Sequence, residues 1–115
     1  DAVELLGELR RLGPRRVVLV DELGGGVASE DSGRYRVPPF PDPSPPLDRT
    51  GGTDAFGANV LAALIRGLDL PEAVRRGAIS FMSVSHGLGS QSGLPGEEQL
   101  EALLAEEPGF GVVSC

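Results

Sequence analysis

The sequence has 115 residues, 40% of them hydrophobic, which is enough for one core in one domain. Its net charge of -7, with arginine as the only basic side chain besides one histidine, argues against a nucleic-acid partner, because such binding relies on clustered basic residues. The absence of lysine excludes a Walker A loop and Schiff-base catalysis. A single cysteine, Cys115, excludes an internal disulfide, and together with one histidine it cannot complete a tetrahedral zinc site.

The hydropathy pattern points away from membranes. No run of about 18 apolar residues is present, and no basic leader precedes an apolar segment. We therefore expect a cytoplasmic protein. The sequence opens directly in an amphipathic pattern without a methionine, as we expect of a piece of a longer chain.

The first elements predict an α/β fold class. Four leucines recur at helical spacing before Gly13 and Pro14 end the pattern: Leu5, Leu6, Leu9 and Leu12. Residues 15–20 form a short β-branched run without alternation, which is typical of a strand covered on both faces of a parallel sheet. A helix followed closely by such a strand is the order expected in an α/β domain.

A hairpin and an extended connector are expected next. Residues 24–26 predict a turn, residues 27–29 a short strand, and the alternating residues 34–37 an edge strand. Six of the nine residues 38–46 are proline, which excludes a helix and a central strand there.

Three helices are expected in the second half. Residues 55–65 are apolar except for Asn59, so this helix should be buried on nearly all sides. Asp69 and Glu72, with Pro71 between them, form a capping pattern for a helix that continues to about Ser83. Its expected buried face consists of Ala73, Val74, Ala78, Phe81 and Met82. Residues 97–107 predict an amphipathic helix, and residues 109–115 either a terminal strand or a loose tail.

The stretch "TGGTD", residues 50–54, has two interpretations. Glycines before a helix N-terminus let the backbone close around an anion, and the first amides of the helix can bind it. Asp54 would then lie beside a bound phosphate, where a carboxylate can accept the proton of an attacking hydroxyl. The alternative is a Gly-Gly turn with Asp54 as the N-cap of the helix.

Residues 48–77, "DRTGGTDAFGANVLAALIRGLDLPEAVRRG", resemble the signature of the ribokinase or PfkB family of sugar and nucleoside kinases. That signature runs D-T-x-G-A-G-D-x-F-x-x-G and continues into a long buried helix. The stretches "ELRRLGPRRVVLV", "SGRYRVPPFP" and "AISFMSVSHGLGSQSGLP" are similar to other parts of the family. The resemblance implies a ribokinase-like layered αβα fold, of which residues 1–115 are the carboxy-terminal nucleotide-binding and catalytic part.

The resemblance also implies a set of site residues. Asp54 matches the catalytic base, and Gly51, Gly52 and Thr53 match the amides of the anion hole. The loop from Asp21 to Gly26, with Gly24, corresponds to the loop under ATP. The positions that match contacts of a monovalent cation are Asp48, the carbonyl of Thr50, Ser83, Gly89 and Ser92 or Gly93.

The implied activity is that of a carbohydrate kinase. Such an enzyme transfers the γ-phosphate of ATP to a hydroxyl of a sugar or related small alcohol, with Mg²⁺ and with K⁺ as the monovalent cation. The expected partner is a small sugar or nucleoside-like substrate, and the full-length protein would pair as a homodimer.

Departures from the family pattern favour a second hypothesis. Thr53 replaces a glycine that gives phosphate close access, Asp21 stands where threonine is usual, and Leu23 stands where glycine is usual. The family's Asn-x-x-Glu motif for magnesium is absent from these residues. The alternative is therefore a non-catalytic remnant or pseudokinase that binds a phosphorylated ligand or a partner.

Further polar residues have simpler interpretations. His86 is expected to cap a loop or be solvated, since no G-x-S-x-G elbow is present for a hydrolase. Arg75 and Arg76 could reach nucleotide phosphates, but a solvated helix face is the favoured interpretation. Arg49 is expected either to contact phosphate or to form a salt bridge.

Overall fold

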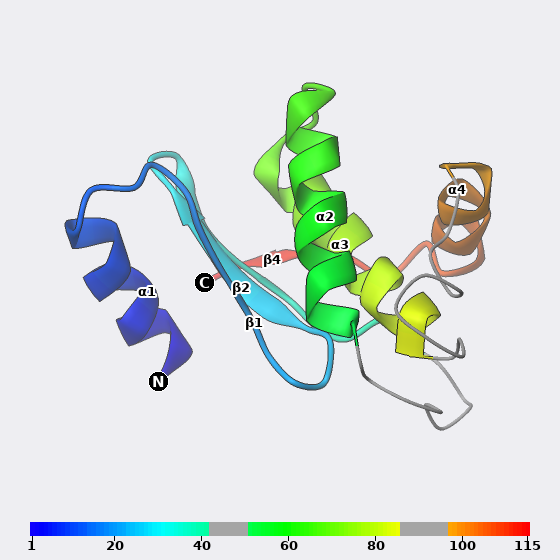
Figure 1. Ribbon diagram of the computed structural model, residues 1–115, viewed down its shortest axis with the longest axis horizontal. Coiled ribbons are helices and arrows are strands. Elements are labelled where there is room, and N and C mark those ends of the chain that lie inside the picture. Colours follow the sequence, from blue (N-terminus) through cyan, green and yellow to red (C-terminus); the bar gives the residue numbers. More distant parts are fainter. Residues whose placement is uncertain (42–50, 86–96) are drawn as a thin grey trace.

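The structure is a computed structural model, and it describes residues 1–41, 51–85 and 97–115. Figure 1 shows three layers, with helix α1 (Ala2–Arg11) on one side of a sheet and helices α2 (Gly52–Ile65) and α3 (Leu70–Ser85) on the other. Helix α4 (Glu97–Glu106) lies beside α3, away from the sheet. The layered αβα arrangement expected from the sequence is therefore present in the described residues.

The sheet has four strands in the order β1, β2, β3, β4, and each neighbouring pair is antiparallel. The strands are β1 (Val17–Val20), β2 (Gly26–Glu30), β3 (Gly33–Val37) and β4 (Val113–Ser114). The hairpin expected from the sequence is confirmed as β2 and β3, with Ala28 opposite Tyr35. Two expectations were wrong: β1 pairs antiparallel with β2 and is only partly buried, and β3 is not an edge, because β4 pairs with it.

The end of the chain illustrates why a short apolar run is ambiguous. Residues 113 and 114 form a strand only because β3 offers its open edge, where Arg36 lies opposite Val113. Beyond them, the amide of Cys115 donates a hydrogen bond to the carbonyl of Arg34 at 3.0 Å. The open alternative between strand and tail is thus decided by a pairing partner almost 80 residues earlier in the sequence.

Helix α1 begins at a capping box, in which the Asp1 carboxylate accepts from the amide of Glu4 at 3.0 Å. The helix contacts β1 and β2. Of its four regularly spaced leucines only Leu6 is fully buried, whereas Leu12 is 81% exposed. The leucine spacing predicted the helix correctly but overestimated its burial, because among the described residues α1 packs only on the sheet.

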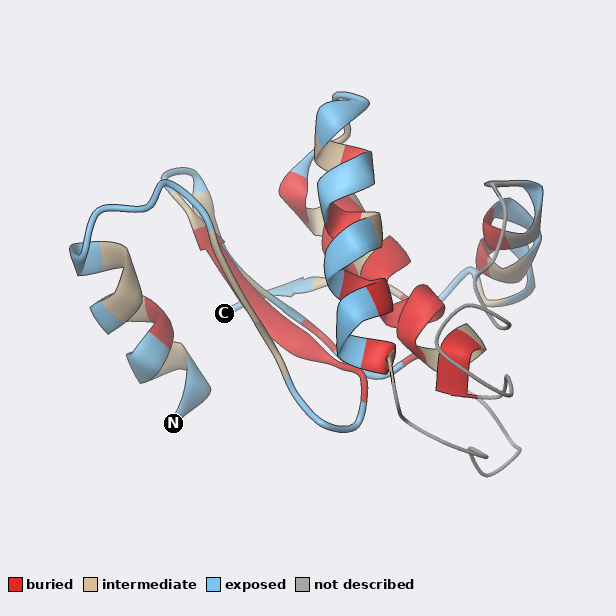
Figure 2. Ribbon diagram, in the orientation of Figure 1, coloured by how far each residue is buried: buried red, intermediate tan, exposed pale blue. Residues whose placement is uncertain are grey.

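Helix α3 is the centre of the core. Asp69 caps it, accepting a hydrogen bond from the amide of Glu72 at 3.0 Å, as the sequence predicted. It contacts α2, α4, β2 and β3, and Figure 2 shows buried residues around most of its circumference. Four of the five residues expected on its buried face are buried, and Met82 is partly buried. Neither α3 nor any other described helix is long and apolar enough to cross a membrane.

Helix α2 is less buried than its composition predicted. Its inner face packs on α3, with Phe56, Val60 and Ala63 buried. A pocket lies between this helix and β1. Its outer face is exposed, with Leu61 at 60% and Ile65 at 77%, and Figure 2 shows this exposed stripe. An all-apolar sequence indicates the capacity for burial, but among the described residues only one side of α2 has neighbours.

The pair Arg75 and Arg76 joins α3 to the end of the chain. Arg76 is 8% exposed and contacts Glu72 at 2.9 Å and Glu101 of α4 at 2.6 Å. Arg75 donates from Nε to the carbonyl of Phe110 at 3.0 Å. The favoured interpretation of a solvated helix face was wrong. Local spacing cannot reveal the distant partners, which are the carboxylate of Glu101 and the carbonyl of Phe110.

Candidate active site

The N-terminus of α2 is built differently from those of α1 and α3. Its N-cap is Gly51, with φ 83°, and no side chain caps it among the described residues. A glycine adopts this left-handed conformation without the steric cost of a Cβ atom. The helix begins where the chain turns at Gly51, and the amide of Ala55 donates to the Gly51 carbonyl at 2.9 Å. The amides of the first turn are thereby left for a ligand or water.

Asp54 lies within the first turn of α2 and is exposed. The interpretation of Asp54 as the N-cap was wrong, because the turn begins three residues earlier at Gly51. Among the described residues, no neighbour buries this acid. Its side chain makes no hydrogen bond or ion pair with the described part of the chain. A carboxylate placed in this way can receive a proton from a molecule bound at the helix N-terminus.

The loop between β1 and β2 is closed by Asp21. Its carboxylate Oδ1 accepts from the amide of Leu23 at 2.8 Å and from the amide of Gly25 at 3.1 Å. The backbone of Asp21 also pairs with Gly25, donating to its carbonyl at 2.9 Å. An Asp at the first position of a turn commonly binds the following amides in this way. Asp21 therefore uses two amides of the loop that the resemblance placed under ATP.

The glycines of this loop are required by close packing. A Cβ atom on Gly26 would lie 2.5 Å from the carbonyl oxygen of Leu19, and one on Gly25 would lie 2.7 Å from that of Val37. Gly24 has φ +99° and lies against the ring of Phe81. The resemblance implied that Gly24 and Gly26 contact the nucleotide, and this stays a prediction. In the structure, the close packing around each of the three glycines leaves no space for a side chain.

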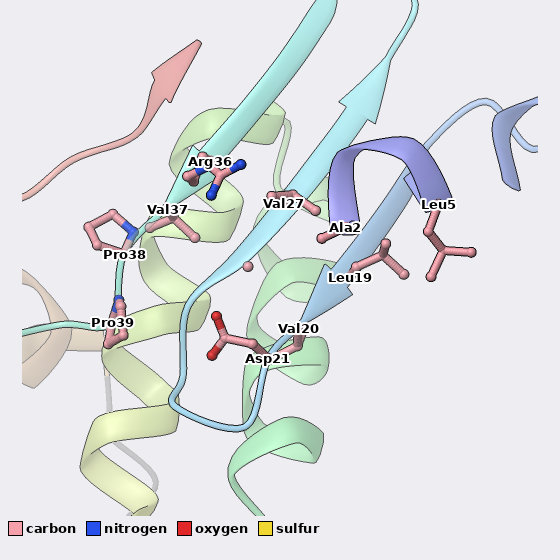
Figure 3. Close-up of a pocket in the computed structure, with 11 residues that line it drawn as sticks. Ala2, Leu5, Leu19, Val20, Asp21, Val27, Arg36, Val37, Pro38 and Pro39 are labelled. Carbon is pink, nitrogen blue, oxygen red and sulfur yellow. The ribbon is translucent and has the colours of Figure 1, made fainter. Parts of the chain in front are cut away.

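Two pockets flank the sheet near this loop. A pocket of about 420 Å³ lies between α1 and the sheet, and Figure 3 shows its apolar lining with Asp21 and Arg36 as the only charged residues. A second, of about 300 Å³, lies between β1 and α2, and Thr53 is among its lining residues. The first is on the α1 side of the sheet, so it is separate from the N-terminus of α2.

Most expected cation ligands lie outside the described residues: Asp48, Thr50, Gly89, Ser92 and Gly93. Arg49 and His86 lie there too. Ser83 is described, on α3, where it is partly buried. Within the described ranges no three Asp, Glu, His or Cys side chains gather in a way that could hold a metal ion.

One residue of this region was missed as part of the site. The sequence suggested Phe81 only as a core residue, but its ring lies beneath both Gly24 and Gly52. The sequence showed the separate features, two glycine turns and one large aromatic residue on a buried helix. Only the tertiary structure brings the three together.

No known family profile matches the chain, and no curated protein sequence matches it. Solved structures do match. Ribokinase from Thermotoga maritima is 25% identical with a TM-score of 0.78, over 89% of this chain and 34% of the other. A putative ribokinase II from E. coli, in complex with ATP and Mg²⁺, is 17% identical with a TM-score of 0.82, over 92% of this chain and 34% of the other.

Phosphofructokinase-2 from Escherichia coli, in complex with potassium, is 19% identical with a TM-score of 0.75, over 90% of this chain and 33% of the other. The chain thus spans about a third of the length of the solved kinases that it matches. Their identities are low, but the shared arrangement extends over nearly all of the chain. The chain therefore has a ribokinase-like fold, and its resemblance to the ribokinase or PfkB family, expected from residues 48–77, is confirmed.

Proposed function

We propose that the chain is the carboxy-terminal nucleotide-binding and catalytic part of an ATP-dependent kinase. The reaction moves the γ-phosphate of ATP to a hydroxyl of a sugar or related small alcohol. The observation that carries the proposal is the N-terminus of α2, where a glycine cap leaves the first amides without a side-chain partner and Asp54 lies exposed in the same turn. The kinase fold of the matched structures supports it.

In the proposed reaction Asp54 accepts the proton of the acceptor hydroxyl. The hydroxyl oxygen then bonds to the γ-phosphorus as the bond between that phosphorus and the bridging oxygen breaks, and the electron pair leaves with ADP. The amides of Gly51, Gly52 and Thr53 face the transferring phosphoryl group and stabilise its negative charge. Thr53 keeps its amide for this role, although its side chain reduces the space that glycine would leave.

Magnesium, when bound with ATP, neutralises phosphate charge. The described residues bring together no set of side chains suited to it, so its ligands would come from the phosphates and from other parts of the protein. For K⁺, only Ser83 of the implied ligands is described. The cation sites, a cytoplasmic location and pairing as a homodimer stay predictions.

The role of Asp54 is tested by Asp54→Asn in the full-length protein. We expect turnover with ATP and the acceptor to fall by a factor of about 10² to 10⁴, the usual contribution of a general base. Asp69→Asn is the matched control, because asparagine is an equally good helix cap, so that variant should keep its turnover. Retention of most turnover by Asp54→Asn, with the fold intact by circular dichroism, contradicts the assignment.

The second candidate is a pseudokinase that binds a phosphorylated ligand or a partner. It is favoured by Asp21, whose carboxylate uses the amides of Leu23 and Gly25 and adds negative charge to the loop. Titration with ATP and magnesium distinguishes the two. A nucleotide site raises the melting temperature by mass action. No shift at millimolar ATP in the folded protein favours the pseudokinase.

A further inference from the structure

The ring of Phe81 lies between two segments of the proposed site. A Cβ atom added to Gly24 would meet the Cδ1 edge of the ring at 2.7 Å, and one added to Gly52 would meet the Cε2 edge at 2.8 Å. The two glycines therefore contact opposite edges of the same side chain. Gly24 belongs to the loop between β1 and β2, and Gly52 is the first residue of α2.

The three residues leave no room for adjustment. Phe81 is 3% exposed, and Gly24 and Gly52 are both buried. Real Cβ atoms essentially never come within 3.0 Å of a nonbonded atom, so any side chain at either glycine would have to displace the ring or the backbone. Because protein interiors are packed as densely as organic crystals, a displacement of the ring at one edge is transmitted to the other.

We propose that Phe81 is a positioning residue that sets the separation between the loop at residues 21–25 and the N-terminus of α2. The inference rests on the proposed function, since both segments would contact one nucleotide only when this separation is held. Displacements on the order of 1 Å in such arrangements are known to reduce rates strongly. Phe81 acts through the two glycines and does not itself touch the nucleotide.

The first test needs no nucleotide. Gly52→Ala pushes the ring toward Gly24, so hydrogen exchange at the amides of Leu23 and Gly25 should become faster by about 5-fold or more. These two amides are protected by the Asp21 carboxylate, which makes them direct reporters of the loop. Adding Phe81→Leu to Gly52→Ala removes the ring edge and should restore most of the protection.

Gly57→Ala is the matched control. It makes the same substitution in the same helix, at a position where the new Cβ atom would have nothing within 4 Å. It should leave exchange at the loop amides unchanged. If Gly52→Ala does not fold, Phe81→Leu alone must speed exchange at both amides. The proposal is overturned if the loop amides of Gly52→Ala exchange at the wild-type rate. If that variant does not fold, a wild-type exchange rate in Phe81→Leu overturns it.

The second test measures the dissociation constant for MgADP. We expect it to rise about 5- to 20-fold in Gly52→Ala and to return to within about 3-fold of wild type in the double variant. A purely structural role of Phe81 would lower the melting temperature without this rescue of affinity. If exchange shows the coupling while wild-type protein binds no MgADP, the kinase assignment fails and the mechanical link between the two segments stands.

Discussion

The contact between α2 and α3 permits a quantitative test of the core. A Cβ atom at Gly77 of α3 would lie 2.7 Å from Cδ1 of Phe56, which is fully buried on α2. Alanine favours a helix interior over glycine by about 1 kcal/mol. Overpacking of a filled core costs about 1–3 kcal/mol, and neither ring nor backbone can move freely here. The two effects oppose each other, so we expect Gly77→Ala to lower the free energy of unfolding by up to about 2 kcal/mol.

Gly57→Ala is the control that separates the helix propensity of alanine from the steric cost of the new Cβ atom. Gly57→Ala lies on α2 with open space around the new Cβ atom, so it should stabilise the protein by about 0.5–1 kcal/mol. Urea denaturation of both variants gives the comparison, and adding Phe56→Leu to Gly77→Ala should recover part of the loss. Equal stabilisation by both alanines would refute the close crossing of α2 and α3.

Two further predictions concern charges. Glu72→Gln should destabilise the protein by about 1–2 kcal/mol and Glu101→Gln by less than about 1 kcal/mol. The reason is that Glu72 is the less exposed partner of the buried Arg76. Urea denaturation measures both free energies of unfolding. The hydrogen bond from Arg10, and its charge, lower the pKa of Asp31 below 3.8. This pair therefore stabilises the fold at neutral pH, and its contribution is lost as pH falls below about 3.8 through the lowered pKa of the folded state. Asp31→Asn should be less stable than wild type at pH 7, and the difference should disappear on acidification.

Local sequence determined the elements whose signals are short-range. Asp69 and Glu72 predicted the start of α3, and the short strand at residues 27–29 followed by the alternating residues 34–37 predicted the hairpin of β2 and β3. Glycines before an apolar helix indicated an anion-binding turn, and the turn does begin at a glycine with positive φ. Hydrogen bonds between residues a few positions apart decide these features, so the sequence alone carries the information.

Tertiary structure decided what depends on partners distant in the chain. The pairing of β4 with β3 turned an ambiguous tail into a strand, and Glu101 turned an expected surface arginine, Arg76, into a buried one. The exposure of Asp54 and of the outer face of α2 likewise depends on which surfaces meet. Hydrophobicity and charge determine whether a residue can be buried or form an ion pair, but its partner depends on how the elements pack. Phe81 beneath Gly24 and Gly52 is the clearest case, because these three residues come together only when the loop between β1 and β2 and the N-terminus of α2 both pack on α3.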